Sequence, residues 1–576
     1  MNEGFPPASR ADWLKLVDGV LKGAPYERRM TTRTPDGLVL DALPERRRDA
    51  RPIAGRALGA PWRIVARIDH TDPAAANTQV LEDLTGGADG LALVFASSPA
   101  AYGFGLPETP QTLARVLDGV LLDLVTLRVE AGGGRELALA LADHVAAQGL
   151  EPVALDIRFG LDPLSDPSSA RTAADLRARG FAAPLVRADG RVHHDAGATD
   201  AQELAAVLST MVAHLRALEA AGLPLDDAAA AIEATLAAEA DQFATLAKLR
   251  ALRLLWARVL ESCGLDVRPL ALHTETAWRG LTRRDPHTNL LRGTIAAFAA
   301  GVGGADSVSV LPFTQALGLP DAFARRLARN TQIILMEESN VHRVADPGAG
   351  AGAVEERTEK LAAAAWQRFR ALEAAGGIVA ARADGSWAAE IAAARRTRTA
   401  EVATRKTPII GTSEFALLGE HAVAVLAPLP ADAPVPPRLA EPFERLRDAA
   451  EAAAAPPRIF LATLGPVAAH TARLGFARAL FEAGGIAALD GPAEAFESSG
   501  AALACLCGAD EAYAAQAEAA ARALKAAGAR HLYLAGRPGE AEAALRAAGI
   551  DRFAFAGCDA VALLTDAQAA LGLGSQ

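Results

Sequence analysis

Short apolar runs alternate with longer helical segments over most of the chain. Six of these runs are Arg63–Ile68, Gly90–Phe95, Val125–Val129, Val153–Ile157, Pro269–His273 and Val308–Leu311. Each run precedes or follows a helical segment, and this spacing is typical of repeated βα units. We therefore expect an α/β fold in which residues 41–426 form a parallel sheet closed into an eight-stranded (β/α)8 TIM barrel.

A second series of apolar runs follows a proline-rich break at residues 427–457. The expected strands after the break are Arg458–Thr463, Ala502–Leu506, His531–Leu534 and Arg552–Phe555, separated by helices such as 509–527. This pattern predicts that residues 458–576 form a doubly wound, flavodoxin-like domain. The break holds eight prolines and one charged helical patch, Phe443–Asp448, and is typical of a semi-rigid linker.

Residues 1–40 form a separate N-terminal arm in this interpretation. Ser9 and Asp12 have the spacing of a helix capping box. One apolar face follows the box, made of Trp13, Leu16, Val17, Val20 and Leu21. An apolar face of this kind is expected to be buried against another surface, either the bottom of the chain's own barrel or a partner subunit. The prolines and glycines that follow predict an extended arm, which favours the partner.

Composition limits the possible functions. The chain of 576 residues has a net charge of -11, only 5% aromatic residues and no basic stripe, so a nucleic-acid partner is not expected. Its four cysteines are too few for a disulfide framework, and we expect them to be reduced and buried. Neither a signal segment nor a run of 18 apolar residues occurs, so we expect no membrane contact and a cytoplasmic location.

Several sequence blocks in the middle of the chain resemble one family. The blocks are Phe243–Trp256, His273–Asn289, Gly303–Val308, Ala316–Pro320 and Ala328–Ser339. In this order they are similar to the methylmalonyl-CoA mutase family over residues 60–415. The resemblance implies a radical rearrangement of a coenzyme A thioester that uses adenosylcobalamin. It also implies a substrate threaded through the barrel and a cobalamin-binding domain after it.

The barrel departs from the family pattern where active members touch the substrate. The resemblance places a tyrosine four residues before a Pro-Trp pair, and Ala57 stands there, before Pro61-Trp62. It also places a tyrosine and a hydrogen-bonding histidine where this chain has Arg191 and Val192. We therefore expect no catalytic residue on this chain. His193 and His194 are poor replacements because, in a strand, only one of two neighbours can face inward.

The second domain departs further. The family's D-x-H-x-x-G motif, in which the histidine ligates cobalt, aligns with Val467, Ala469 and Ala472. Taking His470 as the ligand instead places Ala468 at the aspartate and Arg473 at the glycine, so neither register restores the motif. We expect His470 to be an exposed or capping residue.

The pocket for the nucleotide tail is altered as well. The family's S-x-L motif becomes Cys507-Gly508-Ala509, and its Gly-Gly pair becomes Gly536-Arg537. We therefore expect a degenerate cobalamin-type domain that holds neither cofactor nor metal.

Three functional hypotheses follow. The first is a non-catalytic small subunit of a heterodimeric mutase, paired with a catalytic large subunit that carries adenosylcobalamin. The second is an active acyl-CoA mutase with a rebuilt site. The third is a non-enzymatic regulatory or chaperone partner of a mutase. No H-E-x-x-H, P-loop or G-x-S-x-G motif points to a different enzyme.

Overall fold

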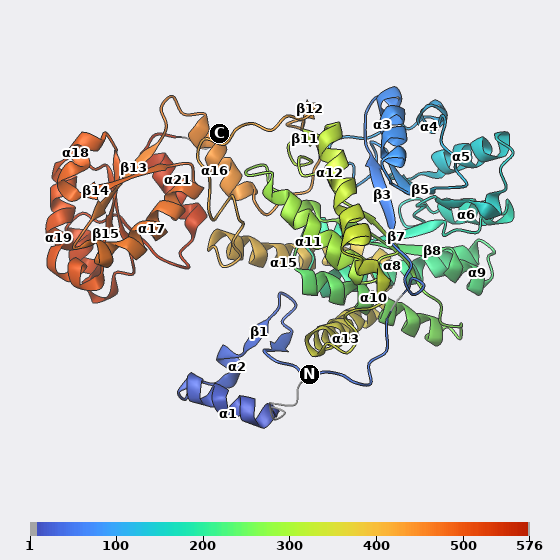
Figure 1. Cartoon of the computed structure of the whole chain (residues 1–576), viewed down its shortest axis with the longest axis horizontal. Helices are drawn as coiled ribbons and strands as arrows, with labels where there is room; N and C mark the ends of the chain where they lie inside the picture. Colours follow the sequence, from blue (N-terminus) through green and yellow to red (C-terminus); the bar gives the residue numbers. More distant parts are fainter. Residues whose placement is uncertain (1–8, 54, 574–576) are drawn as a thin grey trace.

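The first large domain is a parallel barrel. The computed structural model describes residues 9–53 and 55–573 (Figure 1). The barrel strands are β3 (Arg63–Ile68), β4 (Gly90–Val94), β5 (Thr126–Glu130), β6 (Asp156–Arg158), β7 (Val186–Asp189), β8 (Ile232–Ala238), β9 (Ala271–Thr276) and β10 (Ser307–Ser309). Their order is β6-β5-β4-β3-β10-β9-β8-β7, so chain neighbours are also sheet neighbours. A bridge between Leu161 and Val186 joins the two ends, which confirms the predicted eight-stranded barrel.

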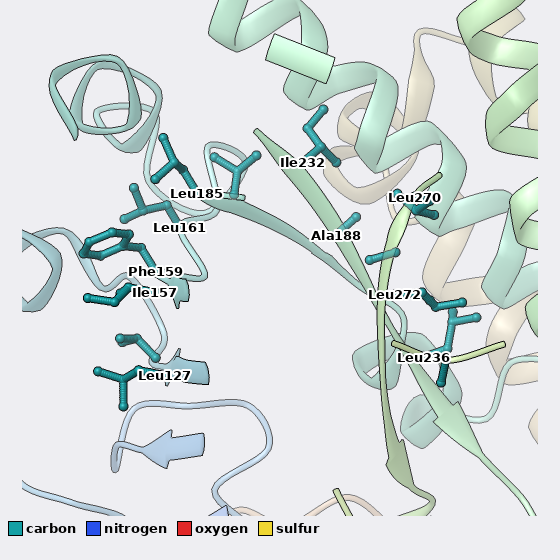
Figure 2. Close-up of a cluster of buried hydrophobic side chains, with 14 of the residues drawn as sticks. Leu127, Ile157, Phe159, Leu161, Leu185, Ala188, Ile232, Leu236, Leu270 and Leu272 are labelled. Atoms are coloured by element: carbon teal, nitrogen blue, oxygen red, sulfur yellow. The ribbon is translucent and has the colours of Figure 1, made fainter. Parts of the chain in front are cut away.

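Helices surround the sheet. They are α3 (Pro73–Thr85), α4 (Pro110–Val116), α5 (Arg135–Ala147), α6 (Ser169–Ala178), α7 (Arg191–Ala196), α8 (Asp200–Ala220), α9 (Leu225–Ala230), α10 (Gln242–Ser262), α11 (Thr288–Val302), α12 (Ala322–Ile333), α13 (Gly352–Ala374), α14 (Gly377–Ala383) and α15 (Ser386–Ala403). Strand residues that face them are apolar and buried, among them Leu127, Ile157, Leu236 and Leu272 (Figure 2). The continuous apolar layer between sheet and helices stabilises the barrel.

Three sequence expectations in the barrel were incomplete or wrong. Strands β7 and β8 were not predicted. The expected run Val153–Ile157 is mostly a 3-10 turn, Pro152–Ala154, and the strand begins only at Asp156. His193 and His194 lie in the short helix α7 rather than in a strand, so both can be buried together.

The second domain is a five-stranded parallel sheet with helices around it. Its strands are β13 (Arg458–Thr463), β14 (Ala487–Pro492), β15 (Leu503–Cys507), β16 (His531–Ala535) and β17 (Arg552–Ala554), and its main helices are α17 (Val467–Ala483), α19 (Asp510–Ala526), α20 (Glu542–Ala547) and α21 (Ala560–Ala570). The order β14-β13-β15-β16-β17 is the flavodoxin-like order that the sequence predicts. Strand β14 escaped prediction because it is a half-exposed edge strand that ends in Gly491-Pro492.

The proline-rich segment between the domains lies against both of them. β12 (Ala427–Pro428) pairs antiparallel with β11 (Gly318–Leu319), which follows the last barrel strand. Farther along, the Trp278 indole donates to the Pro436 carbonyl at 2.8 Å, and α16 (Glu441–Glu451) packs against α21. The segment is therefore fixed at several points along its length.

The N-terminal arm has an anchored part and a projecting part. Strands β1 (Thr31–Arg33) and β2 (Val39–Asp41) form a hairpin whose turn residue Asp36 accepts from the Ala201 backbone at the start of α8, 3.3 Å away. Lys360 on α13 donates to the Val39 carbonyl at 2.6 Å. The hairpin is thus held on the chain's own barrel.

Helices α1 (Arg10–Leu21) and α2 (Tyr26–Arg29) extend away from the barrel (Figure 1). The predicted Ser9–Asp12 capping box is present. Of the predicted apolar face, Val17 is buried, whereas Leu16 and Val20 are 72% and 78% exposed. This part of the face has no cover within the described residues, which favours the partner-contact alternative.

The cysteine expectation was partly wrong. Cys505 and Cys507 are buried in β15, but Cys263 is exposed at the end of α10, and all four cysteines are free thiols. No helix in the described part of the chain has the length and apolar character that a membrane crossing needs.

Candidate functional site

The interior of the barrel is filled with charged side chains. Alternate residues of each strand face inward, and here the inward positions include Arg67, Arg128, Glu130, Glu233 and Glu275. All five are at least 96% buried. Charges at these positions require partners because an unpaired buried charge is strongly unfavourable.

The lower part of the network centres on Glu130 and Glu233. Arg128 donates to both oxygens of Glu233, at 3.0 and 2.9 Å. Glu130 accepts ion pairs from Arg187 at 2.8 Å and from Arg191 at 2.5 Å. These contacts connect β5, β7 and β8 with the start of α7 across the barrel axis.

The upper part continues from Arg191 toward the carboxyl ends of the strands. Arg191 contacts Glu275 at 3.1 Å, and Glu275 contacts Arg67 at 3.2 Å. Asp69 then lies between Arg67 and Arg325, at 2.8 and 2.7 Å. Six arginines and six carboxylates make up the whole network: Arg67, Arg128, Arg158, Arg187, Arg191, Arg325, Asp69, Glu130, Asp156, Asp189, Glu233 and Glu275.

The titration of these groups reflects their surroundings. Burial alone would raise the pKa of Glu130, but Arg187, Arg191 and Arg128 outweigh it and hold that pKa well below its usual range. Burial likewise opposes the arginines at Asp69, where Arg325 and Arg67 lower the pKa to about 2. Burial, followed by the charge of Arg128, holds the pKa of the His273 imidazole well below its ordinary value.

The positions that active family members use are occupied differently here. Ala57 lies in an exposed turn before β3, and Val192 is half-buried on α7. Arg191, at the family's tyrosine position, sits in the network instead of presenting an aromatic ring. The Trp387 indole donates to His193 at 3.1 Å, and burial lowers the His193 pKa to about 3. His194 lies 3.1 Å from Glu239, so both imidazoles contact other side chains of this chain.

Gly197 matches the glycine of the family motif, and it has a structural role in this chain. Gly197 has φ of +113°, and a Cβ there would lie 2.7 Å from the Arg395 Cβ on α15. A glycine is therefore needed for α15 to approach α7. The neighbouring Asp195 accepts from the Tyr102 hydroxyl at 3.0 Å.

In the second domain, the loop after β13 is too short for a separate ligand motif. Only Leu464, Gly465 and Pro466 lie between β13 and α17, so Val467, Ala469 and Ala472 are residues of that helix. The His470 Nδ1 faces the Gly465 carbonyl at 3.3 Å, within the first turn of α17.

Arg473 lies beside Gly536, the residue that follows β16. A Cβ on Gly536 would lie 3.3 Å from the Arg473 guanidinium, which also donates to the Gly508 carbonyl at 2.7 Å and stacks on Tyr513 at 4.7 Å. Arg537 stands at the position of the family's Gly-Gly pair, but its guanidinium faces the Phe555 ring, 4.3 Å away. The sequence indicates Arg473 only as the residue at the glycine position when His470 is taken as the ligand, and it does not indicate that Arg473 lies beside Gly536.

The remaining tail positions fit a polar ligand poorly. Cys507 is fully buried in the sheet, and Ala509 is the N-cap of α19 without a side-chain hydrogen bond. No cluster of three potential metal ligands occurs among the described residues. This set of donors does not fit the family's cobalt contact or its nucleotide tail.

A barrel joined to a flavodoxin-like domain is the architecture expected of a cobalamin-dependent acyl-CoA mutase. The family model for methylmalonyl-CoA mutase matches residues 183–464. The chain is 44% identical to the methylmalonyl-CoA mutase small subunit of Streptomyces virginiae. The alignment covers 99% of this chain and 98% of that protein. The chain belongs to the methylmalonyl-CoA mutase family.

Other relatives separate into two groups. The methylmalonyl-CoA mutase small subunit of Propionibacterium freudenreichii subsp. shermanii is 36% identical over 99% of this chain and 96% of its own length. The methylmalonyl-CoA mutase of Cereibacter sphaeroides is 36% identical over only 40% of this chain and 33% of its own length. End-to-end similarity is therefore seen with proteins named small subunits.

We predict that breaking the interior network destabilises the barrel. Arg128→Met leaves Glu233 without its bidentate partner and should lower the free energy of unfolding by about 3–5 kcal/mol. Urea unfolding followed by tryptophan fluorescence measures this mainly for the barrel domain, because five of the six tryptophans lie between residues 62 and 387 and only Trp13 lies on the arm.

The matched control is Arg258→Met on α10 of the barrel, which removes an exposed pair with Glu261 and should cost about 0–1 kcal/mol. The double variant Arg128→Met/Glu233→Met should recover part of the loss, since no unpaired charge remains. Equal unfolding free energies for Arg128→Met and Arg258→Met would contradict a structural role for the network.

We also predict that restoring the ligand residues does not restore cobalamin binding. Val467→Asp with Ala469→His adds the two missing side chains, but they stand on a helix and Arg473 still fills the tail region. Each buried polar group of the tail that loses a partner costs about 1–3 kcal/mol. After mixing with cobalamin and desalting, the visible spectrum should show no histidine-ligated, base-off species.

Adding Arg473→Ala to this double variant tests the steric part separately. A retained base-off spectrum in the double variant itself would show that the pocket is open and that only the metal contact is missing.

Proposed function

We propose that the chain is the non-catalytic subunit of a heterodimeric, adenosylcobalamin-dependent methylmalonyl-CoA mutase. In this proposal a catalytic large subunit binds the cofactor and interconverts succinyl-CoA and methylmalonyl-CoA, and the complex works in the cytoplasm. This chain contributes a folded barrel and an interaction surface. It holds no catalytic residue, cofactor or metal of its own.

The observation that carries the proposal is the charged network inside the barrel. A substrate threaded along the barrel axis would have to displace Arg191 and Glu275, and with them the partners of Glu130 and Arg67. Each displaced charge would stay buried without a counter-charge, which is strongly unfavourable. The interior therefore supports a structural role for the barrel and argues against a rebuilt active site.

The projecting helix α1 supports a permanent partner. Leu16 and Val20 lie uncovered on a helix that is well capped and is tied to β2 by the ion pair of Arg10 with Asp41, 2.6 Å long. The Tyr26 hydroxyl donates to the same carboxylate at 2.5 Å. An ordered helix that exposes two large apolar residues is suited to packing on another protein.

We predict that the purified chain supplied with adenosylcobalamin and succinyl-CoA forms no methylmalonyl-CoA. Addition of the large subunit should produce activity, and the two chains should co-elute in a one-to-one ratio through high salt. The large subunit assayed by itself is the control. Turnover by this chain in the absence of the large subunit would support the rebuilt-site alternative, and loss of co-elution in salt would support a regulatory partner.

We predict that α1 contacts the large subunit. Leu16→Glu with Val20→Glu should raise the dissociation constant of the heterodimer at least about a hundredfold, because each large apolar side chain contributes about 1.5–3 kcal/mol on burial. Removal of residues 1–30 should leave a folded chain that no longer co-purifies with the large subunit.

The matched control is Leu124→Glu with Val153→Glu, two residues that are 66% and 68% exposed on the barrel itself. Unchanged affinity in the Leu16→Glu/Val20→Glu variant and in the truncated chain would place the contact elsewhere.

A further inference from the structure

A small cavity rich in arginine lies at the carboxyl end of the barrel strands. It is bounded by the loop after β9, by α7, by α15 and by the segment 437–442 that leads into the second domain. Its volume is about 60 Å³, and its lining includes Arg279, Arg395, Arg398 and Arg438 with one carboxylate, Asp195. Four arginines therefore border one small space in a chain whose net charge is -11.

Two of the four arginines have carboxylate partners outside the cavity. Arg279 pairs with Glu239 at 2.7 Å. Arg438 donates to both oxygens of Glu444, at 3.0 and 2.7 Å. These two residues hold the walls of the cavity in place.

The other two have no carboxylate partner among the described residues. Arg398 is partly buried and donates to the carbonyl oxygens of Gly197 and Ala198, at 2.6 and 3.2 Å. Arg395 is one turn earlier on α15, and its aliphatic stem packs over Gly197. Arg395 and Arg398 therefore bring to the same cavity two positive charges that make no direct ion pair.

The carboxylate in the lining is already engaged. Asp195 accepts from the Tyr102 hydroxyl at 3.0 Å, and its other oxygen lies 3.3 Å from the His194 Nδ1. Burial and the charge of Arg279 lower the pKa of Arg398 to about 10, against the opposing charges of Glu239, Asp200 and Asp36, and the guanidinium stays charged at neutral pH. A partly buried cation whose hydrogen bonds go only to carbonyl oxygens is stabilised by an anion beside it.

We propose that this cavity binds a phosphate group between Arg395 and Arg398, either as free inorganic phosphate or as the phosphate of a small monoester. Planar guanidinium groups match phosphate oxygens through paired hydrogen bonds. The cavity volume also fits, because one water needs about 10–15 Å³ of such space and a phosphate has five heavy atoms. Thr399 also lines the same space.

Three parts of the chain border the cavity. Arg395 and Arg398 belong to α15, Arg279 follows β9, and Arg438 belongs to the segment before α16. The proposed contacts come from α15, while Arg279 and Arg438 keep their carboxylate partners in the cavity wall. This inference rests on groups within this chain.

Titration calorimetry of the full chain with inorganic phosphate, at constant ionic strength set by chloride, tests the proposal. We expect saturable binding and a rise in melting temperature that follows phosphate concentration. Sodium acetate at the same ionic strength should give neither effect. AMP distinguishes the two sources: binding of AMP identifies a monoester site, and binding of phosphate without AMP identifies a site for the free ion.

Two variants locate the binding. Arg395→Gln and Arg398→Gln should each raise the dissociation constant for phosphate at least about tenfold, because each removes a charge-assisted contact. Arg395 is exposed and makes no ion pair with a described residue, so Arg395→Gln should fold even if Arg398→Gln does not. Arg522→Gln on α19 is the control and should bind as the parent chain does. Absence of saturable binding, or unchanged affinity in a folded Arg395→Gln chain, would overturn the proposal.

Discussion

Charge balance inside the barrel is the constraint on which the rest of this structure depends. Each buried ion costs several kcal/mol of lost hydration, and the cost is offset only when every charge has a partner. Glu130 meets this condition through Arg187 and Arg191, and Glu233 meets it through Arg128. Because the partners come from different strands, the network also fixes how those strands stand relative to one another.

The composition of the strands explains how far the sequence could predict the fold. The barrel was predicted from six apolar runs, and the buried charges Arg67 and Arg128 did not obscure β3 and β5. Strand β7 was missed because it has only four residues, and β8 because three of its seven residues are alanine, which favours helix. His193 and His194 were expected in a strand, whereas β7 ends at Asp189 and α7 begins two residues later.

The sequence predicts which residues of the family motifs this chain lacks more readily than it predicts which side chains occupy their space. Alignment with the family motifs indicated which residues differ, among them Ala57, Val192, Ala469 and Cys507. It could not indicate what occupies the space, because that depends on contacts between distant segments. Arg473 reaches Gly508 and Gly536 from a helix that precedes both, and Arg191 reaches Glu275 across the barrel.

The closed network has an evolutionary consequence. A single substitution that removes one charge of the network leaves its partner buried and unpaired, so it lowers the stability of the barrel. Opening the barrel axis would require several compensating changes at once, on strands far apart in the sequence. The filled interior is therefore resistant to stepwise change.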